Sequence, residues 1–173
     1  LENGKDTLAL KQALALLLTI KRIPQLYYGT EVLMNGTKEV TDGNVRCDFP
    51  GGFAGDKHNA FTAEGRTKAE NAMFNWLSKL LKWRRNNMVI TKGKQIQFIP
   101  YKGVYVIARQ WNDQTILTIL NGTSQAVTLP LDRYAEVIGN HQEAKDVISG
   151  RKVKLGSELQ LKARDTKVIE LSM

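Results

Sequence analysis

The chain has 173 residues, of which 42% are hydrophobic and 24% are charged. This composition is long and apolar enough for a buried core, and it excludes disordered and fibrous classes. The longest uninterrupted apolar run, Ala13 to Leu18, is far shorter than the roughly 20 residues of a membrane span, so no span is expected. The single cysteine, Cys47, excludes an internal disulfide, and with only His58 and His141 beside it the sequence offers no zinc-type ligand cluster.

The formal net charge of +8 could attract nucleic acid or anionic lipid. Part of this charge gathers in Lys79, Lys82, Arg84 and Arg85, at the end of a predicted helix, where cations complement the helix dipole. The other basic residues are scattered among acids and form no stripe interleaved with aromatic residues. We therefore expect no nucleic-acid partner. No export signal is visible at the first residues, and the compartment is left open.

The first half of the chain has the pattern of an α/β fold. Apolar residues recur at helical spacing from Asp6 to Arg22, which predicts a helix. The almost entirely apolar run from Gln25 to Met34, interrupted by Gly29, predicts a strand buried on both faces. Glycines are frequent from Asn35 to Gly65, which indicates a long loop of the kind that is usually functional. A second amphipathic helix is expected from Arg66 to Arg85.

After Met88 the apolar pattern changes to a period of two residues. Short strands separated by turn signals are predicted at 95–99, 104–110, 115–120, 126–129, 153–155, 158–161 and 167–171. Strands of this length and spacing are typical of an antiparallel sandwich or Greek key. We therefore expect an α+β chain with residues 1–87 in one part and an all-β domain in residues 88–173.

A single buried strand cannot form a sheet by itself. A complete (β/α)8 barrel needs roughly 250 residues, and fewer than ninety residues precede the β domain here. The strand's neighbours are therefore expected to come from elsewhere, as they would if the chain were the end of a larger protein.

Two motifs carry a resemblance to a known family. The segment Ile23-Pro24-Gln25-Leu26-Tyr27-Tyr28-Gly29-Thr30-Glu31 resembles the eighth-strand motif of the α-amylase superfamily of glycoside hydrolases. The segment from Asp42 to Phe53, with Arg46-Cys47-Asp48-Phe49-Pro50-Gly51-Gly52, resembles the following loop in the neopullulanase and cyclomaltodextrinase branch. The resemblance implies that residues 1–87 are the last helix-strand-helix of a (β/α)8 barrel and that residues 88–173 are the C-terminal β-sandwich.

The same resemblance implies that this chain has no catalytic residue. Members of the family hydrolyse α-glucosidic bonds with retention, using an Asp nucleophile, a Glu acid/base and a stabilising Asp, and all three precede the helix that begins here near Asp6. The chemistry needs two carboxyl groups about 5 to 5.5 Å apart. No family motif gives such a role to Glu31, Asp42, Asp48 or Asp56, and Glu31 is expected to be a buried partner of a basic residue. The chain alone is therefore expected to be inactive.

Substrate binding is the role that the resemblance implies for Asp42 and Arg46. They match positions that contact glucose units on the non-reducing side of the cleavage point in related amylases. A carboxylate can accept hydrogen bonds from sugar hydroxyls and a guanidinium can donate to them. The alternative is an Asp42–Arg46 ion pair that orders the loop. Gly43 and Cys47 depart from the family pattern, in which Pro and a further Arg are usual.

The remaining aromatic residues and the two Asn-x-Thr sequences are assigned structural roles. Tyr27 and Tyr28 are expected in the core rather than as sugar-stacking platforms, and Trp76 and Trp83 are expected on the packed face of the second helix. Trp111 could stack on starch, but a structural role is preferred. Asn35-Gly36-Thr37 and Asn121-Gly122-Thr123 could accept a glycan, yet both fit glycine-containing turns better.

Together these observations predict part of a glycoside hydrolase that cleaves α-1,4-glucosidic bonds in maltodextrins, pullulan, cyclodextrins or starch. Its expected partners are an α-glucan and the rest of the barrel. No cofactor or metal is assigned to the chain, and calcium in the intact enzyme is left open. Unpaired strand edges at 26–28 and an exposed face of the first helix predict self-association through residues 1–60. The alternative is a non-catalytic carbohydrate-binding or interaction module centred on the β-sandwich.

Overall fold

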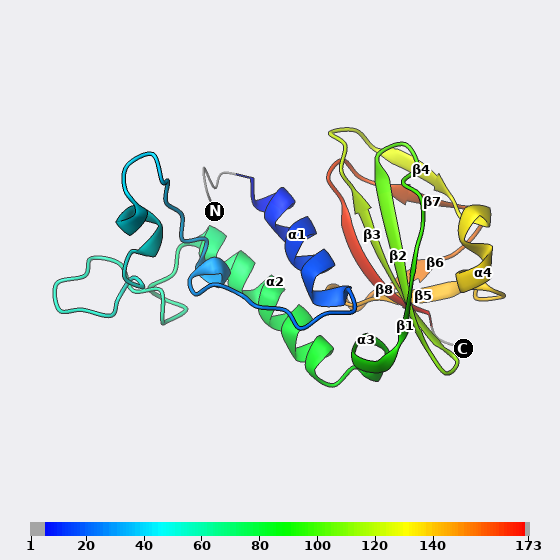
Figure 1. The fold of residues 1–173 in the computed structure, drawn as a ribbon, viewed down its shortest axis with the longest axis horizontal. Coiled ribbons are helices and arrows are strands. Elements are labelled where there is room, and N and C mark those ends of the chain that lie inside the picture. The colour runs from blue at the N-terminus through cyan, green and yellow to red at the C-terminus, as the bar shows by residue number, and fades with distance from the viewer. Residues whose placement is uncertain (1–5, 172–173) are drawn as a thin grey trace.

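The computed structural model describes residues 6–171 and consists of a helical part packed against a β-sandwich (Figure 1). Helices α1 (Thr7–Thr19) and α2 (Lys68–Arg85) lie side by side, and α1 also contacts strands β3 and β8. The long segment between the two helices extends away from the sheets. No helix in the described part of the chain is long and apolar enough to cross a membrane.

The β part consists of two antiparallel sheets. The larger has six strands in the order β1-β2-β3-β8-β5-β6, and the smaller pairs β4 with β7. Their bounds are β1 (Lys94–Gln97), β2 (Val104–Trp111), β3 (Gln114–Asn121), β4 (Val127–Pro130), β5 (Glu143–Asp146), β6 (Lys152–Lys154), β7 (Glu158–Leu161) and β8 (Thr166–Leu171). The predicted all-antiparallel β domain is confirmed.

The six-stranded sheet is covered on both faces, because its strands alternate between two cores. One core lies toward β4 and β7 and includes Val106, Leu117 and Ile169. The other includes Ile116 and Val168, which alternate with the first set along β3 and β8, together with buried residues of α1 and α2. Trp76 and Trp83 pack against this second core, as expected. The helices therefore shield one face of the sheet.

The predicted elements agree with the structure except at a few positions. Both long helices and the seven strands predicted after Met88 are present within a few residues of their expected bounds. Strand β5, the helices α3 (Met88–Lys92) and α4 (Ala135–Ile138) and the 3-10 helix η3 (Asp132–Tyr134) were not predicted. Only Ala144 of β5 is buried, so its sequence carries no alternating pattern, and pairing with β6 and β8 defines it.

The strand predicted from Gln25 to Met34 is not formed. After an irregular stretch, the chain turns at Gly29 and makes the short 3-10 helix η1 (Thr30–Val32), with Gly29 and Leu33 in the left-handed region. A strand is stable only when neighbouring strands satisfy its N–H and C=O groups, and no strand in the described residues pairs with this segment.

Two arginines bind the carbonyl groups at the C-terminal end of α1. Arg84 of α2 donates to the carbonyls of Leu18 and Arg22, and Arg109 of β2 donates to the carbonyl of Thr19 at 3.0 Å. Arg109 also donates to the carbonyl of Gly93 at 2.7 Å, although its side chain is buried. Burial lowers the pKa of both guanidinium groups, and the charge of Arg84 adds to this effect at Arg109. The last carbonyl groups of α1, which have no partner within the helix, thus accept hydrogen bonds from α2 and β2.

Further polar contacts join the helices to the sheet. The Thr118 hydroxyl donates to the Thr19 hydroxyl, which donates to the Ala15 carbonyl. The Trp83 indole N–H donates to Glu170 of β8 at 2.6 Å, and the Asn87 side chain donates to the same carboxylate oxygen. The expected boundary between residues 87 and 88 falls just after α2, but the two sides of it share a core.

The second Asn-x-Thr sequence forms a turn in the structure. Asn121 is fully buried, its amide nitrogen donates to the carbonyls of Gln125 and Lys162, and its oxygen accepts from Thr123. The Asn121 side chain therefore links the end of β3 to Gln125 and Lys162.

We predict that Arg109→Met lowers the free energy of unfolding of the 173-residue chain by about 1 to 3 kcal/mol, because the buried carbonyls of Thr19 and Gly93 lose their donor. Urea unfolding followed by circular dichroism measures the loss. Arg151→Met removes an exposed guanidinium from the β5–β6 turn and should change stability by less than about 0.5 kcal/mol. Equal stability of the two variants would contradict the role given to Arg109.

Candidate functional site

The candidate site is a pocket of about 340 Å³ formed by the start of the long loop. Its lining combines two tyrosines, two asparagines and one arginine with small and apolar residues. The lining residues are Tyr27, Tyr28, Thr30, Met34, Asn35, Gly36, Asn44, Val45, Arg46 and Cys47. Both motifs that carry the family resemblance therefore contribute to one pocket.

Close contact between residues 36–37 and 44 gives the pocket its shape. A side chain at Gly36 would place its Cβ 2.2 Å from the Asn44 carbonyl oxygen, so glycine is required there. The Thr37 N–H donates to the Asn44 side chain at 2.7 Å. The 3-10 helix η2 (Asp42–Arg46) is capped by Thr41, whose hydroxyl accepts from the Asn44 N–H. The chain therefore folds back on itself and brings Arg46 to the pocket.

Tyr27 and Tyr28 lie at the surface, so their expected place in the core is wrong. They are 57% and 43% exposed, and their ring centroids are 4.6 Å apart. The Tyr28 hydroxyl donates to the Cys47 carbonyl at 2.8 Å. Hydrogen bonding with Tyr27 raises the pKa of Tyr28, and burial and nearby charges act in the same direction. Both rings are therefore exposed to contact by a ligand.

Asp42 and Arg46 occupy opposite ends of η2, and both are exposed. Arg46 lines the pocket, whereas Asp42 does not. No ion pair joins them in the described part of the chain, where the four ion pairs involve other residues. The alternative in which these two side chains order the loop through an ion pair is therefore not seen, and both charged groups face solvent.

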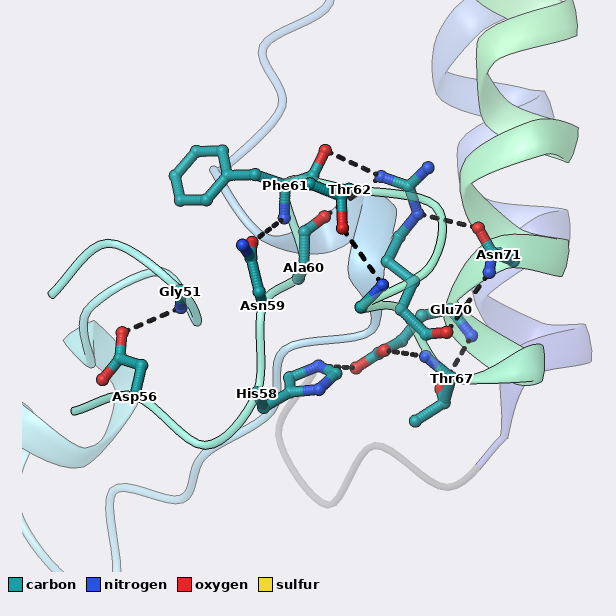
Figure 2. A network of polar contacts seen from close by, with 12 residues as sticks. Gly51, Asp56, His58, Asn59, Ala60, Phe61, Thr62, Thr67, Glu70 and Asn71 are labelled. Atoms are coloured by element: carbon teal, nitrogen blue, oxygen red, sulfur yellow. Dashed lines mark hydrogen bonds and ion pairs between the residues drawn. The ribbon is translucent and has the colours of Figure 1, made fainter. Parts of the chain in front are cut away.

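Local hydrogen bonds fix the second half of the loop on the start of α2 (Figure 2). His58 Nε2 donates to Glu70 Oε1 at 3.1 Å. The other oxygen of Glu70 accepts from the Thr67 N–H at 2.7 Å, and the Thr67 hydroxyl accepts from the Glu70 N–H, which completes a capping box. Burial opposes the charged form of Glu70, but the Thr67 hydrogen bonds and His58 outweigh it and lower the pKa of this carboxyl group.

Arg66 ties the same loop to the body of α2. Its guanidinium donates to the Asn71 side chain and to the Ala60 carbonyl, and it lies 4.0 Å from the centre of the Phe74 ring. The ring of Phe61 points away from this network in Figure 2 and is 62% exposed. The loop is thus held by many contacts while it presents aromatic surface to solvent.

The remaining carboxylates have no common site. Asp56 accepts from the N–H groups of Gly51 and Phe53, so it shapes a turn. Glu31 is half-buried beside Leu26 and Phe74 and makes no ion pair with the described residues, so its expected partnership with a basic residue is wrong. Within residues 6–171, no three His, Cys, Asp or Glu side chains lie together as a metal site would require.

Sequence reasoning missed the two asparagines of the pocket. Asn35 was considered only as a turn residue or glycan acceptor, and Asn44 was not considered. The Gly36 that follows Asn35 was the available signal, since it permits the close approach of Asn44. Amide, guanidinium and phenol groups around one shallow pocket can donate to and accept from neighbouring hydroxyls, which is what recognition of a sugar requires.

Comparison with known proteins identifies the β part. Residues 95–170 match the family model described as the cyclo-malto-dextrinase C-terminal domain. This range covers nearly the whole of the β-sandwich, from β1 to the penultimate residue of β8.

Relatives with similar sequences extend the likeness to the helical part. The cyclomaltodextrin glucanotransferase of Geobacillus stearothermophilus is 27% identical over 171 residues, which cover 94% of this chain and 21% of the relative. The maltogenic α-amylase of Bacillus acidopullulyticus is 25% identical over 174 residues, covering 96% of this chain and 26% of the relative. The chain thus spans about a fifth to a quarter of the length of these relatives.

Solved structures show the same fold. The α-amylase of Geobacillus thermoleovorans, solved with acarbose, superposes with a TM-score of 0.72 at 24% identity and covers 96% of this chain and 33% of its own. A maltogenic α-amylase from Thermotoga neapolitana gives a TM-score of 0.71 at 17% identity, with 97% of this chain and 37% of its own covered. Taken with the family match of the β part, these likenesses support the resemblance carried by the two motifs: residues 95–170 match the cyclo-malto-dextrinase C-terminal domain, and nearly the whole chain is similar to a part of cyclomaltodextrin glucanotransferases and α-amylases.

Proposed function

We propose that residues 1–87 form the last helix-strand-helix of a (β/α)8 barrel and that residues 88–173 form the C-terminal β-sandwich of the same enzyme. The segment around Leu26 supports this proposal, because it is mainly apolar and has no strand partner among the described residues. A pocket of about 250 Å³ lies between this segment and α2, lined by Leu26, Glu31, Phe74, Leu77, Ser78, Leu81 and Lys82. Neighbouring barrel strands would cover this apolar surface and let residues 25–34 become a strand.

We further propose that the enzyme cleaves α-1,4-glucosidic bonds of maltodextrins, pullulan, cyclodextrins or starch with retention of configuration. Two relatives are a cyclomaltodextrin glucanotransferase and a maltogenic α-amylase, and their names point to this substrate class. The two catalytic carboxyl groups would lie about 5 to 5.5 Å apart and would come from barrel strands outside this chain. On this proposal the chain by itself releases no reducing ends from cyclodextrin, pullulan or amylose.

The observation that carries the binding role is the pocket at the start of the loop. Arg46 borders it without an ionic partner among the described residues, and Tyr27, Asn35 and Asn44 complete the lining. A guanidinium donates to adjacent hydroxyl oxygens of a glucose unit, and hydrogen bonds to charged groups contribute about 1.5 to 3 kcal/mol. Asp42, at the other end of η2, would accept from hydroxyls of a neighbouring glucose unit. Both residues are proposed to bind substrate.

The fixed second half of the loop supports this role. A binding loop that is ordered before the ligand arrives loses less conformational entropy on binding. The His58–Glu70 contact, the capping box and Arg66 hold residues 58–67 on α2. The structure is therefore consistent with a loop that presents its charged groups in one arrangement.

We propose that the isolated chain self-associates, although its first helix exposes less apolar surface than the sequence predicted. The prediction that the first helix exposes an apolar face is largely wrong, because Leu10, Leu14 and Leu18 are buried in the second core. Exposed apolar residues outside the candidate site lie instead in the connecting segment, at Ile23, Val40, Phe53 and Phe61. We propose that these side chains contact the rest of the barrel in the intact enzyme, or a second copy when the barrel is absent.

We predict that Arg46→Ala or Asp42→Ala, made in the intact enzyme, lowers kcat/KM for maltoheptaose about tenfold while it affects maltotriose much less. A long substrate reaches the outer glucose positions and a short one does not, and a lost charged hydrogen bond corresponds to about this factor. Steady-state kinetics on both substrates gives the ratio. Lys38→Ala, an exposed charge of the same loop outside the pocket, is the matched control. Equal effects on the two substrates would refute the assignment.

We predict that Glu70→Gln destabilises the chain by about 0.5 to 1 kcal/mol at pH 7, since glutamine keeps the cap but loses the charge at the helix start. The pKa of Glu70 is lowered in the folded chain, so the stabilisation by its charge is complete above the unfolded pKa of about 4.3 and is lost as the pH falls through the folded value. The difference from wild type should therefore shrink between pH 5 and pH 3. Urea unfolding at several pH values measures it.

The matched control for this measurement is Glu64→Gln, an exposed carboxylate of the same loop that makes no ion pair in the described chain. It should change stability little at any of these pH values. A Glu70→Gln difference that stays constant from pH 7 to pH 3 would show that the charge of Glu70 does not stabilise the loop.

A further inference from the structure

Another, more open pocket of about 630 Å³ lies where the end of α1 meets the edge of the larger sheet. Three separate segments of the chain contribute to it: the turn after α1, the stretch from the end of α3 into β1, and the end of β2. The lining residues are Lys21, Lys92, Lys94, Gln95, Gln110, Trp111 and Asn112. None of them belongs to the candidate site described above.

The pocket is strongly basic. Lys21, Lys92 and Lys94 contribute their charges, and no carboxylate lines the pocket. None of the three lysines takes part in an ion pair with the described residues. Asp113, next along the chain, lines a different pocket. Three lysines without an ionic partner among the described residues give this open pocket a positive potential, which attracts an anion.

Trp111 gives the pocket an aromatic wall. Its side chain is 37% exposed, in contrast to the partly buried Trp76 and Trp83 that pack in the second core. The ammonium nitrogen of Lys92 lies 5.8 Å from the centre of the Trp111 ring. An indole of this kind can pack against the apolar face of a sugar ring while the cation beside it binds a charged substituent.

The amide side chains of the pocket retain hydrogen-bonding capacity. The Gln95 oxygen accepts from the Lys21 backbone N–H at 2.6 Å, which leaves its NH₂ group for a ligand. The Gln110 nitrogen donates to the Thr115 hydroxyl at 3.2 Å, which leaves its oxygen as an acceptor. The Gln95 contact also fixes the turn that carries Lys21. The pocket thus combines cations, an aromatic face and polar groups that suit hydroxyls.

Protection of a sheet edge explains only part of this arrangement. Strand β1 is at the edge of the six-stranded sheet, and lysines on edge strands discourage pairing with other chains. That role accounts for Lys94. It does not account for Lys21, which follows α1, or for an exposed tryptophan beside Lys92.

We propose that this pocket binds a glucose unit that carries a phosphate monoester. A phosphate monoester has a charge of about −1.5 to −2 at pH 7 and three acceptor oxygens, which the ammonium groups of Lys92 and Lys94 can neutralise. The glucose ring packs on Trp111, and Gln95 and Gln110 bind its hydroxyls. The site is separate from Asp42 and Arg46, so it does not depend on the function proposed for them.

The first measurement titrates the isotope-labelled 173-residue chain with glucose 6-phosphate, glucose and inorganic phosphate, each followed by NMR. Each tryptophan gives one indole N–H signal, and the signal of Trp111 is assigned from its loss in Trp111→Phe. We expect glucose 6-phosphate to shift this signal, while the signal of Trp83, which donates to Glu170, stays in place. We also expect its Kd to be at least about tenfold lower than the Kd of glucose or of phosphate.

Variants then test the residues. Lys92→Met with Lys94→Met should raise the Kd for glucose 6-phosphate about tenfold and leave the weak binding of glucose unchanged. Lys145→Met with Lys154→Met removes two exposed lysines of the β5–β6 hairpin and should leave the Kd unchanged. Thermal unfolding of each variant establishes that it is folded. The comparison of the three probes on the wild-type chain stands even where a variant fails to fold.

Three results would overturn the proposal. Equal affinities for glucose and glucose 6-phosphate would mean that the lysines select no anion. Equal affinities for phosphate and glucose 6-phosphate would mean that no sugar is recognised. The absence of any shift at 20 mM ligand, roughly the weakest binding of interest, would leave the lysines with edge protection alone. If the proposal holds, a maltooligosaccharide phosphorylated on an inner glucose is titrated next. Tighter binding than that of glucose 6-phosphate indicates a phosphorylated polymer as the ligand, and weaker binding indicates a free sugar phosphate.

Discussion

The arrangement of the whole chain depends on how the C-terminal end of α1 is satisfied. This helix ends without a basic residue in its last turn, and Ile20, which follows it, is extended rather than left-handed. Arg84 and Arg109 supply the missing donors, one from α2 and one from β2. Two like charges near one helix end are tolerated because the negative end of the helix dipole and several carbonyls face them. These two arginines therefore join α1, α2 and the larger sheet at the C-terminal end of α1.

The location of the buried arginine also explains why the β part is not an ordinary two-layer sandwich. Arg109 and Thr118 lie on the face of the larger sheet that packs against α1, and both make hydrogen bonds with Thr19. Ile116 and Val168 lie on the same face and belong to the second core, with the buried residues of the helices. Without the helices, this face would expose a charge and apolar side chains together. A β-sandwich of this kind is thus a poor candidate for an independent module, which weighs against the alternative function considered from the sequence.

Alternating sequence patterns predicted the elements whose stability is local or whose partners lie within the chain. Strands β2 and β3 are rich in apolar residues, are buried over most of their length and pair with each other, so their apolar pattern and their structure agree. The segment around Leu26 has an equally apolar pattern, but its structure depends on partners that the described residues do not supply. Tyr27 and Tyr28 were placed in the core for the same reason and lie at the surface instead. An apolar pattern predicts that a segment is buried, but it does not say which segments cover it. The observed structure of residues 25–34 depends only on the contacts that the described residues make.

The two pockets could not be predicted from the sequence to the same extent. Arg46 was identified from its motif, because the residues of that site lie close together in the chain and the family resemblance marks them. The basic pocket has no such motif, since Lys21 and Trp111 are ninety residues apart and meet only because Arg109 and Gln95 join the end of α1 to the edge of the sheet. The contact that holds the fold together therefore also creates the pocket. A change that loosens the end of α1 would separate Lys21 from Trp111 while leaving η2 and Arg46, which are held by local contacts, in place.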